Sequence, residues 1–387
     1  MSRHLIPVSL LYSTTGPYGA LGREAVDGAL AAIAETNADP TLSFQIEPVI
    51  EDPAGSAERY AMFAETAVRQ KGCRHIVGSI TSSSRKEILP VVERHGALLW
   101  YAFPYEGYEA SDSVIYLGAC PNQHLLPLFD TVMPRFGRRP FIVGSNYIWG
   151  WEISRIAREI IEASGGQVVS ERFVPLGSTD IDHLIEEIRQ KKPDFILSNL
   201  VGESIMAFLQ AYEGLRKADS VFSANSTPII ACNLCETDLA GLCAEARAGH
   251  MTTSIYFDGI STDENAAFKA RMAKRYGGTR CLTTPFVSAY TAMSVLARAI
   301  TDAGTDAPEA IRRTATARVF DTPIGALRID PRTHHAALRP HIAVSDEAGR
   351  YQVFQTAPKP IEADPYLVRS SHRDMSSSPV TTLKVIK

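Results

Sequence analysis

Segments typical of β-strands and segments typical of helices alternate along almost the whole chain. Leu5 to Tyr12 is a short apolar run, and after a turn-like stretch Val26, Leu30 and Ile33 recur at spacings of four and three, which is one face of a helix. A second apolar run, Phe44 to Ile50, starts the same order again. Alternation of this kind is typical of parallel sheets that helices cover on both faces. The chain is therefore predicted to have an α/β fold.

The same pattern predicts further elements along the chain. Strands are expected at His75 to Ile80, Ala97 to Tyr101, Val114 to Leu117, Phe141 to Ser145, Val168 to Pro175, Phe195 to Leu200, Ile229 to Cys232 and His250 to Ser254. The clearest later helices are Trp151 to Ala163, Ile181 to Lys191, Asp263 to Gly277 and Pro285 to Ala303. After Asp321 only short strands follow, at Ala326 to Ile329, Ile342 to Val344 and Tyr351 to Gln355.

The length of 387 residues predicts two domains, because a domain usually has roughly 100 to 200 residues. The strand and helix rhythm restarts at Pro140 to Ser145, after the long segment Cys120 to Arg139, much as it began at residue 5. Two doubly wound parallel-sheet lobes would hold a ligand in the cleft between them, at the carboxyl ends of both sheets. The tail 370–387, rich in Ser and charge, is expected to be poorly ordered.

Charge and terminal sequence argue against several kinds of partner. The formal charge is -4, and no run of five or more Lys and Arg occurs, so neither nucleic acid nor a membrane surface is expected as a direct partner. Met1 to Leu11 has no cleavage site of small residues, and no stretch approaches the roughly 18 to 20 apolar residues of a membrane span. A cytoplasmic protein is expected; the alternative is a periplasmic one, if an export signal has been trimmed.

Motifs for metals, cofactors and catalysis are missing from the sequence. The six cysteines are scattered, and Cys232-x-x-Cys235 has no second pair to complete a tetrahedral metal site. There is no GxSxG, HExxH or P-loop motif. We therefore expect no metal, no cofactor and no enzymatic activity.

Four segments that directly follow predicted strands are candidates for a binding site. Thr81 to Ser84 opens a helix, where backbone N–H groups and hydroxyls would hold a carbonyl or carboxylate oxygen; the alternative is a simple helix cap. Tyr101 to Tyr108 and Tyr147 to Trp151 bring seven aromatic side chains, which either wall a small pocket or pack in the core. Glu203, Asn233 and Glu236 could accept hydrogen bonds from an amide or pair with an ammonium group, or could simply begin helices.

Several of these segments resemble one family of binding proteins. The matching stretches are Val77-Gly78-Ser79, Arg85-Lys86, Pro104-Tyr105-Glu106-Gly107, Pro121-Asn122-Gln123, Gly144-Ser145-Asn146-Tyr147-Ile148 and Asp364-Pro365-Tyr366. From about residue 5 to Val368 the chain resembles the AmiC-like amide sensors of bacterial aliphatic amidase operons, and more distantly the urea and branched-chain amino-acid binding proteins.

The resemblance implies a type I periplasmic-binding-protein fold whose chain crosses three times between lobes. The N-terminal lobe would then contain residues 1–119 and 254–327, and the C-terminal lobe residues 120–253 and 328–369. It also implies that Ser82, Tyr101, Pro104 and Tyr147 line the ligand site. Four further site positions depart from the family pattern, since Ile80 and Trp149 replace tyrosines, and Phe103 and Glu203 replace threonines. Glu203 would favour a ligand with additional N–H donors, such as urea or an amino acid.

The function implied by the resemblance is a cytoplasmic sensor that binds a short amide or urea-like ligand. Such a sensor acts as a negative regulator of amidase-type gene expression through an antiterminator protein. The alternative is the substrate-binding component of an ABC transporter for urea, amides or branched-chain amino acids. Whether the chain forms a homo-oligomer stays open.

Overall fold

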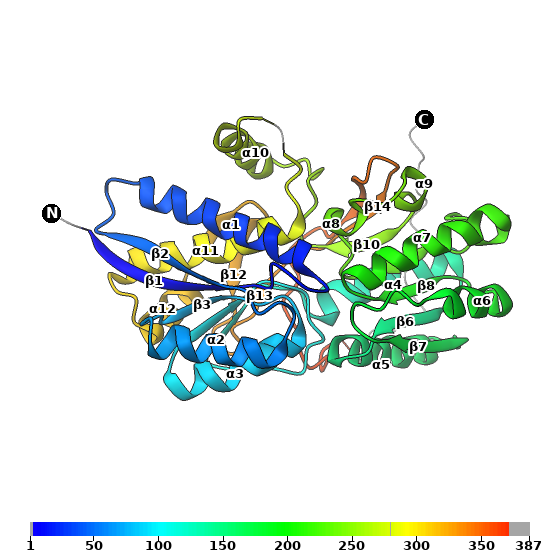
Figure 1. Cartoon of the computed structure of the whole chain (residues 1–387), viewed down its shortest axis with the longest axis horizontal. Helices are drawn as coiled ribbons and strands as arrows, with labels where there is room; N and C mark the ends of the chain where they lie inside the picture. The colour runs from blue at the N-terminus through cyan, green and yellow to red at the C-terminus, as the bar shows by residue number, and fades with distance from the viewer. Residues whose placement is uncertain (1–2, 279, 371–387) are drawn as a thin grey trace.

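Two β-sheets, each covered by helices, form two lobes that lie side by side along the longest axis of the molecule (Figure 1). The computed structural model describes residues 3–278 and 280–370. The sheet of the first lobe has the strand order β2-β1-β3-β4-β5, and all four pairings are parallel. Its strands are β1 (His4–Leu11), β2 (Phe44–Glu51), β3 (His75–Gly78), β4 (Leu98–Tyr101) and β5 (Val114–Tyr116). The parallel sheet predicted for this part of the chain is confirmed.

Helices from two distant parts of the chain cover this first sheet. Near the N-terminus these are α1 (Gly19–Ala38), α2 (Ala57–Arg69) and α3 (Ser82–His95); the later ones are α11 (Thr284–Ala303) and α12 (Pro308–Ala317). Helix α10 (Asp263–Tyr276) lies outside this layer and packs on α11 (Figure 1). Helix α1 packs directly along α11. The contact is close because Gly28 has no side chain: a Cβ there would lie 2.0 Å from the carbonyl oxygen of Phe286.

The sheet of the second lobe has seven strands in the order β15-β14-β10-β9-β8-β6-β7. Strands β6 to β10 pair in parallel, whereas β14 and β15 join antiparallel at one edge. The strands are β6 (Phe141–Ser145), β7 (Ser170–Val174), β8 (Ile196–Asn199), β9 (Ile229–Ala231), β10 (Met251–Ser254), β14 (His341–Ser345) and β15 (Tyr351–Thr356). The helices of this part of the chain are α4 (Pro121–Phe136), α5 (Ile148–Ala163), α6 (Asp182–Lys191), α7 (Glu203–Ala218), α8 (Glu236–Leu239) and α9 (Ala244–Arg247), with the short 3₁₀ helix η1 (Ser220–Phe222).

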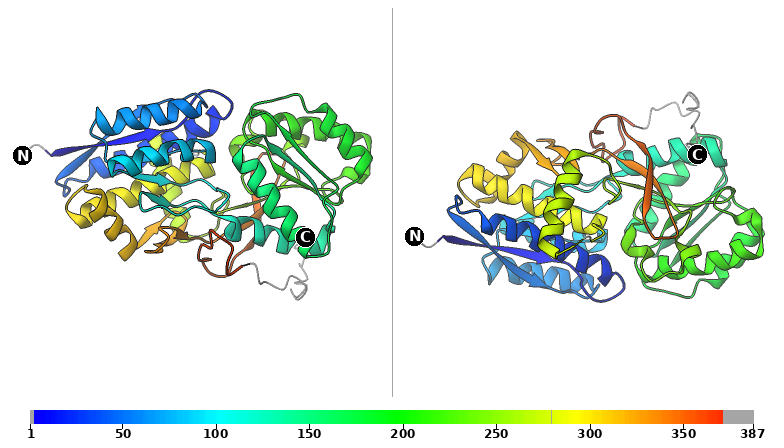
Figure 2. Two further views of the ribbon diagram at one scale, coloured as in Figure 1. Left: turned by 90° about the horizontal axis from the view of Figure 1, so that it is seen from below. Right: turned by 90° about the horizontal axis from the view of Figure 1, so that it is seen from above.

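A small antiparallel sheet precedes the last return of the chain to the second lobe. It contains β11 (Val319–Thr322), β12 (Gly325–Ile329) and β13 (Ala336–Ala337), and a bridge between His335 and Tyr116 joins it to the edge of the first sheet. Figure 2 shows the segments that run between the lobes. Because β12 and β13 adjoin the first lobe through this bridge, we propose to assign residues 328–337 to the first lobe rather than to the second. We propose to place the third crossing between Ala337 and His341.

Two further predictions concern the C-terminal tail and membrane-spanning segments. Ser370 donates hydrogen bonds to Asp364 through its backbone and its hydroxyl group, and the remainder of the predicted tail, 371–387, lies outside the described residues. Of the helices that the structure describes, none has both the length and the apolar character required to cross a membrane.

Candidate functional site

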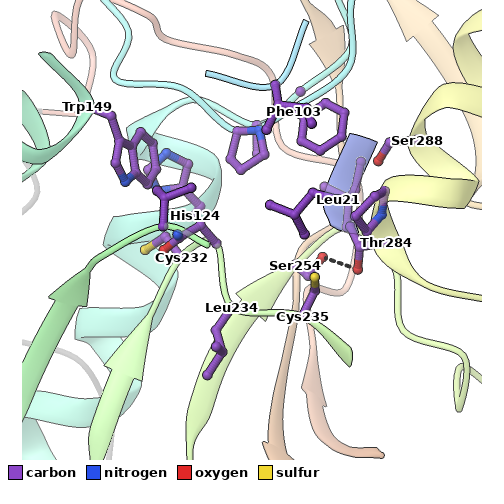
Figure 3. Close-up of a pocket in the computed structure, with 18 of the residues that line it drawn as sticks. Leu21, Phe103, His124, Trp149, Cys232, Leu234, Cys235, Ser254, Thr284 and Ser288 are labelled. Atoms are coloured by element: carbon purple, nitrogen blue, oxygen red, sulfur yellow. Dashed lines mark hydrogen bonds between the residues drawn. The ribbon is translucent and has the colours of Figure 1, made fainter. Parts of the chain in front are cut away.

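A small cavity lies between the two lobes, at the carboxyl ends of strands from both sheets (Figure 3). The volume open to the centres of water-sized molecules is about 70 Å³. Since one water requires roughly 10 to 15 Å³ on this measure, the cavity has room for a few waters or one small solute. The side chains around it are mainly apolar.

The lining residues come from the same kind of place in each lobe. In the first lobe they follow β3, β4 and β5: Ile80, Thr81, Ser82, Ala102, Phe103, Pro104, Gly118 and Ala119. In the second lobe they follow β8 and β9 or end β10: Val201, Cys232, Asn233, Leu234, Cys235, Asp238, Thr253, Ser254 and Ile255. The rest lie at or near helix N-termini: Leu21, Gln123, His124, Tyr147, Trp149, Thr284, Pro285 and Ser288. The cavity thus occupies the position at which open parallel sheets bind ligands.

Seven of the nine site residues expected from the sequence line this cavity. They are Ile80, Ser82, Phe103, Pro104, Tyr147, Trp149 and Asn233. The structure brings them together from both lobes, although they are spread over more than 150 positions of the sequence. Their contact with a ligand stays a prediction.

Tyr101 and Glu203 are not among the residues that line this cavity, and their contact with a ligand also stays a prediction. Tyr101 is fully buried, and its hydroxyl donates to the carbonyl oxygen of Ile80 at 2.9 Å. Glu203 is exposed at the first turn of α7, because Gly202, at φ 64°, turns the chain and directs the Glu203 amide to the carbonyl of Pro17 at 3.0 Å. In this conformation the side chain of Glu203 lies outside the cavity.

His124, which the sequence analysis missed, supplies a hydrogen-bond acceptor. Its Nε2 lies 3.1 Å from the carbonyl oxygen of Tyr105, and a carbonyl only accepts, so Nε2 carries the proton. Burial lowers the pKa of His124 to about 4, which keeps the ring neutral. Nδ1 is then a buried lone pair, and it has no partner within the described residues. The only sequence signal was its place directly after Pro121-Asn122-Gln123, at the start of a helix.

Three more lining residues, Asn233, Trp149 and Thr253, have a polar atom without a partner among the described residues; for Thr253 it is the hydroxyl oxygen. The side-chain NH₂ of Asn233 donates to the carbonyl of Leu200 at 2.9 Å, so the amide oxygen is the free atom and accepts. The indole N–H of Trp149 is also unpartnered, although the side chain is only 3% exposed. Buried polar groups are normally hydrogen-bonded, so these atoms indicate where a ligand would bind.

Two free thiols and one carboxyl group also line the cavity. Cys232 and Cys235 are reduced and buried, and burial raises the pKa of both thiols. Asp238 accepts from the Cys235 amide at 3.0 Å, and burial raises the pKa of its carboxyl to about 6. Among residues 3–278 and 280–370, no group of three or more His, Cys, Asp or Glu is arranged to hold a metal ion.

The other aromatic residues of the two candidate loops have structural or surface positions. Tyr105 is buried, and its hydroxyl contacts Nε2 of His335, whose ring stacks on Tyr116 at 4.1 Å. Tyr108 and Trp151 are exposed, and the Trp151 indole donates to Asn146 at 2.9 Å. Of the seven aromatic residues in these two loops, Phe103, Tyr147 and Trp149 line the cavity.

Comparison with known proteins identifies the family. A model described as "Periplasmic binding protein domain" matches residues 6–372. The Leu/Ile/Val-binding protein homolog 6 of Brucella melitensis is 22% identical over 340 residues, which cover 86% of this chain and 85% of that protein. The leucine-, isoleucine-, valine-, threonine- and alanine-binding protein of Pseudomonas aeruginosa is 23% identical, with 85% and 87% coverage.

Solved structures show the same fold at low sequence identity. An ABC transporter solute-binding protein of R. palustris in complex with 4-hydroxybenzoate aligns with a TM-score of 0.81 at 20% identity, covering 94% of this chain and 100% of its own. The substrate-binding protein LivJ of Streptococcus pneumoniae, in complex with isoleucine, aligns with 0.81 at 17% identity, covering 92% and 100%. These alignments confirm the predicted α/β type I periplasmic-binding-protein fold. The chain belongs to the periplasmic binding protein domain family.

Proposed function

We propose that this chain is the substrate-binding component of an uptake system, and that its ligand is a small neutral molecule with an amide or urea group. The observation that carries the proposal is the set of free polar atoms in the cavity. His124 Nδ1 and the Asn233 amide oxygen are acceptors, the Trp149 N–H is a donor, and the Thr253 hydroxyl can donate or accept. A primary amide or urea has one carbonyl oxygen and several N–H groups, which is the complementary set.

The lining also favours a neutral ligand over an amino acid or an aromatic acid. None of the described lining residues is Lys or Arg, so a ligand carboxylate would have no cationic side chain to pair with. Isoleucine and 4-hydroxybenzoate, found in the two solved relatives, both have a carboxyl group. We therefore place amides and urea ahead of those ligands for this chain.

The role as a transport component is supported by the relatives, which are named as binding proteins or transporter solute-binding proteins. In such a role the ligand binds the closed arrangement of lobes better than the open one, and thereby shifts the equilibrium toward closure.

A second candidate is the amide sensor that regulates amidase-type genes through an antiterminator protein. It is favoured by the resemblance at Pro104-Tyr105-Glu106-Gly107 and Pro121-Asn122-Gln123, two segments that border the cavity through Pro104 and Gln123. Both candidates use the same ligand chemistry; they differ in where the protein works and in what it binds when closed.

Calorimetric titration tests the ligand class directly. Purified protein is titrated with acetamide, urea, isoleucine and 4-hydroxybenzoate under identical conditions. Saturable binding of acetamide or urea, without binding of the two acids, is the expected result. Binding of isoleucine or 4-hydroxybenzoate alone would overturn the proposed ligand.

The cellular role is tested by fractionating cells that express the native gene from its own promoter. A periplasmic protein is expected for the transport component, and a cytoplasmic one would support the sensor instead.

A further inference from the structure

A cluster of four charged side chains lies next to Ser82; three of them are buried, and the Lys86 side chain is 38% exposed. We call Arg85, Lys86, Glu106 and Glu109 the Arg85 cluster. Arg85 Nη2 lies 2.8 Å from Glu106 Oε1, and Arg85 Nε lies 2.8 Å from Glu109 Oε1. Lys86 Nζ approaches Glu109 at 3.0 Å. Arg85 is fully buried and Glu106 is 2% exposed. The two positive and two negative charges balance, which makes the burial of the cluster tolerable.

The guanidinium of Arg85 has little freedom to turn away from Glu106. It lies 4.7 Å from the ring centroids of both Tyr101 and Tyr105, so aromatic faces hold it in place. Glu109 is fixed in turn by the hydroxyl of Tyr116, which donates to Oε1 at 2.9 Å. Burial opposes the ionisation of Glu109, but Arg85 and Lys86 together still lower its pKa.

Glu106 connects this cluster to the cavity through its second oxygen. Glu106 Oε2 contacts Ser82 Oγ, and Ser82 lines the cavity. A carboxylate only accepts hydrogen bonds, whereas a hydroxyl group has one hydrogen and two lone pairs. The hydrogen of the Ser82 hydroxyl is therefore directed to Glu106. Arg85 Nη1, at 3.4 Å, donates to one lone pair of Ser82, and the other remains for a ligand.

We propose that Glu106 is a positioning residue that sets the hydrogen-bond polarity of the ligand site, by making Ser82 an acceptor for a ligand N–H. The inference rests on the proposed amide or urea ligand and names the residue that selects for its N–H groups. It reverses the expectation that hydroxyls at this helix start hold a carbonyl or carboxylate oxygen. Such an oxygen would meet a lone pair of Ser82 and lose the hydrogen bonds it makes in water.

The substitution Glu106→Gln inverts this arrangement with almost no change of shape. Arg85 only donates, so the introduced amide turns its oxygen to Arg85 and its NH₂ to Ser82. The Ser82 hydrogen is then free to point into the cavity. Arg85 keeps Glu109 as a charged partner, which preserves one ion pair of the cluster. Glu109→Gln is the matched control: it removes the same charge from the same cluster, but Glu109 does not contact Ser82.

The test compares acetamide with acetone, in which a methyl group replaces the NH₂, by NMR titration of each protein variant. Glu106→Gln is expected to lower the ratio of acetamide to acetone affinity at least about tenfold. Glu109→Gln is expected to leave it within about twofold. An unchanged ratio in Glu106→Gln overturns the role of Glu106, whereas no acetamide binding to the unmodified protein overturns the proposed ligand itself.

Ser82→Ala keeps the proposal testable if Glu106→Gln does not fold. It is expected to weaken acetamide roughly tenfold and to leave acetone almost unchanged, because only the amide offers an N–H to Ser82. Equal weakening of both ligands would show that Ser82 is not an acceptor. In the Ser82→Ala background, Glu106→Gln is expected to have no further effect on the ratio.

Discussion

The imidazole of His124 and the indole of Trp149 lie 5.8 Å apart between ring centroids, tilted by 55°, and each ring has one nitrogen without a partner among the described residues. His124 Nδ1 accepts and Trp149 Nε1 donates, so the pair presents both hydrogen-bond polarities within one small region of the cavity (Figure 3). A ligand with a carbonyl oxygen and an N–H group can satisfy both.

Trp149→Phe removes the indole N–H and keeps an aromatic ring in its place. Acetamide affinity is expected to fall roughly tenfold, because the carbonyl oxygen loses its donor. The melting temperature without ligand is expected to stay the same or rise slightly, since an unpartnered buried N–H is removed. Calorimetry and thermal unfolding measure the two effects. Trp151→Phe is the control: its indole is exposed and bonds to Asn146, so it is expected to bind acetamide normally. A loss in both variants would speak against a specific role of Trp149.

Much of the fold could be predicted from the sequence, because the spacing of apolar residues reflects which side chains are buried. Strands of a parallel sheet are buried on both faces, so they appear as short continuous apolar runs. The sequence analysis missed α4, since Pro121, Pro127 and Pro134 argue against a helix. Pro121 is harmless at the first helical position, and the helix buries Leu125, Leu128, Phe129 and Val132, which offsets the interior prolines. Tertiary packing of this kind cannot be derived from local propensity.

The site was predicted in part for the same reason. Loops that follow parallel strands converge on one edge, so Ser82, Phe103 and Asn233 could be placed near a ligand. Which way a side chain points depends on the local backbone geometry, so the exposure of Glu203 at the start of α7 could not be predicted. The partner of each polar atom depends on contacts over long sequence distances, such as Asn233 with Leu200, and these could not be foreseen.

Acid is expected to destabilise the protein between about pH 6.5 and pH 4. Burial lowers the pKa of five histidines to about 4: His75, His124, His250, His335 and His341. Their neutral form is favoured in the fold, so their contribution to stability is complete above pH 6.5 and is lost as the pH falls toward 4. Burial raises the pKa of Glu236 to about 7 and of Asp238 to about 6. These two carboxyl groups add stability as the pH falls, so they offset part of the loss from the five histidines.

Urea unfolding at pH 7, 6, 5 and 4 measures the effect. The free energy of unfolding is expected to fall by about 1.4 kcal/mol per pH unit for each net proton taken up on unfolding. His250→Gln is expected to flatten the slope, and exposed His183→Gln to leave it unchanged. A stability that is constant from pH 7 to pH 4 would contradict the neutral, buried state of these rings.

Gln123 is expected to be critical for stability. Its NH₂ group donates to the carbonyls of Ala336 and Ile361, at 2.9 and 2.8 Å, and its oxygen accepts from the Cys120 amide at 3.1 Å. Gln123→Ala leaves these backbone groups without their partner and is expected to cost about 2 to 4 kcal/mol. Urea unfolding measures the change, with exposed Gln190→Ala as a control that stays within about 0.5 kcal/mol. A small effect at Gln123 would mean that water replaces its hydrogen bonds.

Gly202 lies at a contact between the two lobes, and we expect lobe closure to require a glycine there. The carbonyl of Pro17, in the first lobe, accepts from the Glu203 amide at 3.0 Å, and a Cβ on Gly202 would lie 2.0 Å from that carbonyl oxygen. Gly202→Ala is therefore expected to keep the lobes apart. Because the proposed ligand site lies between the lobes, acetamide affinity is expected to fall at least about tenfold. Alanine at position 202 would also be strained, because Gly202 has a φ of 64°; this strain is expected to cost roughly 1 to 3 kcal/mol of stability.

Gly214→Ala separates the effect on closure from a general effect of substitution in α7. Gly214 lies in the same helix, and a Cβ added there would have no neighbouring atom within 4 Å. Alanine at this position is therefore expected to stabilise the protein by about 1 kcal/mol and to leave the affinity for acetamide unchanged. Small-angle X-ray scattering with saturating acetamide would show a compact form for Gly214→Ala and a more extended one for Gly202→Ala. If Gly202→Ala bound acetamide normally and became equally compact, the Pro17 contact would have no part in closure, and the ligand alone would hold the lobes together.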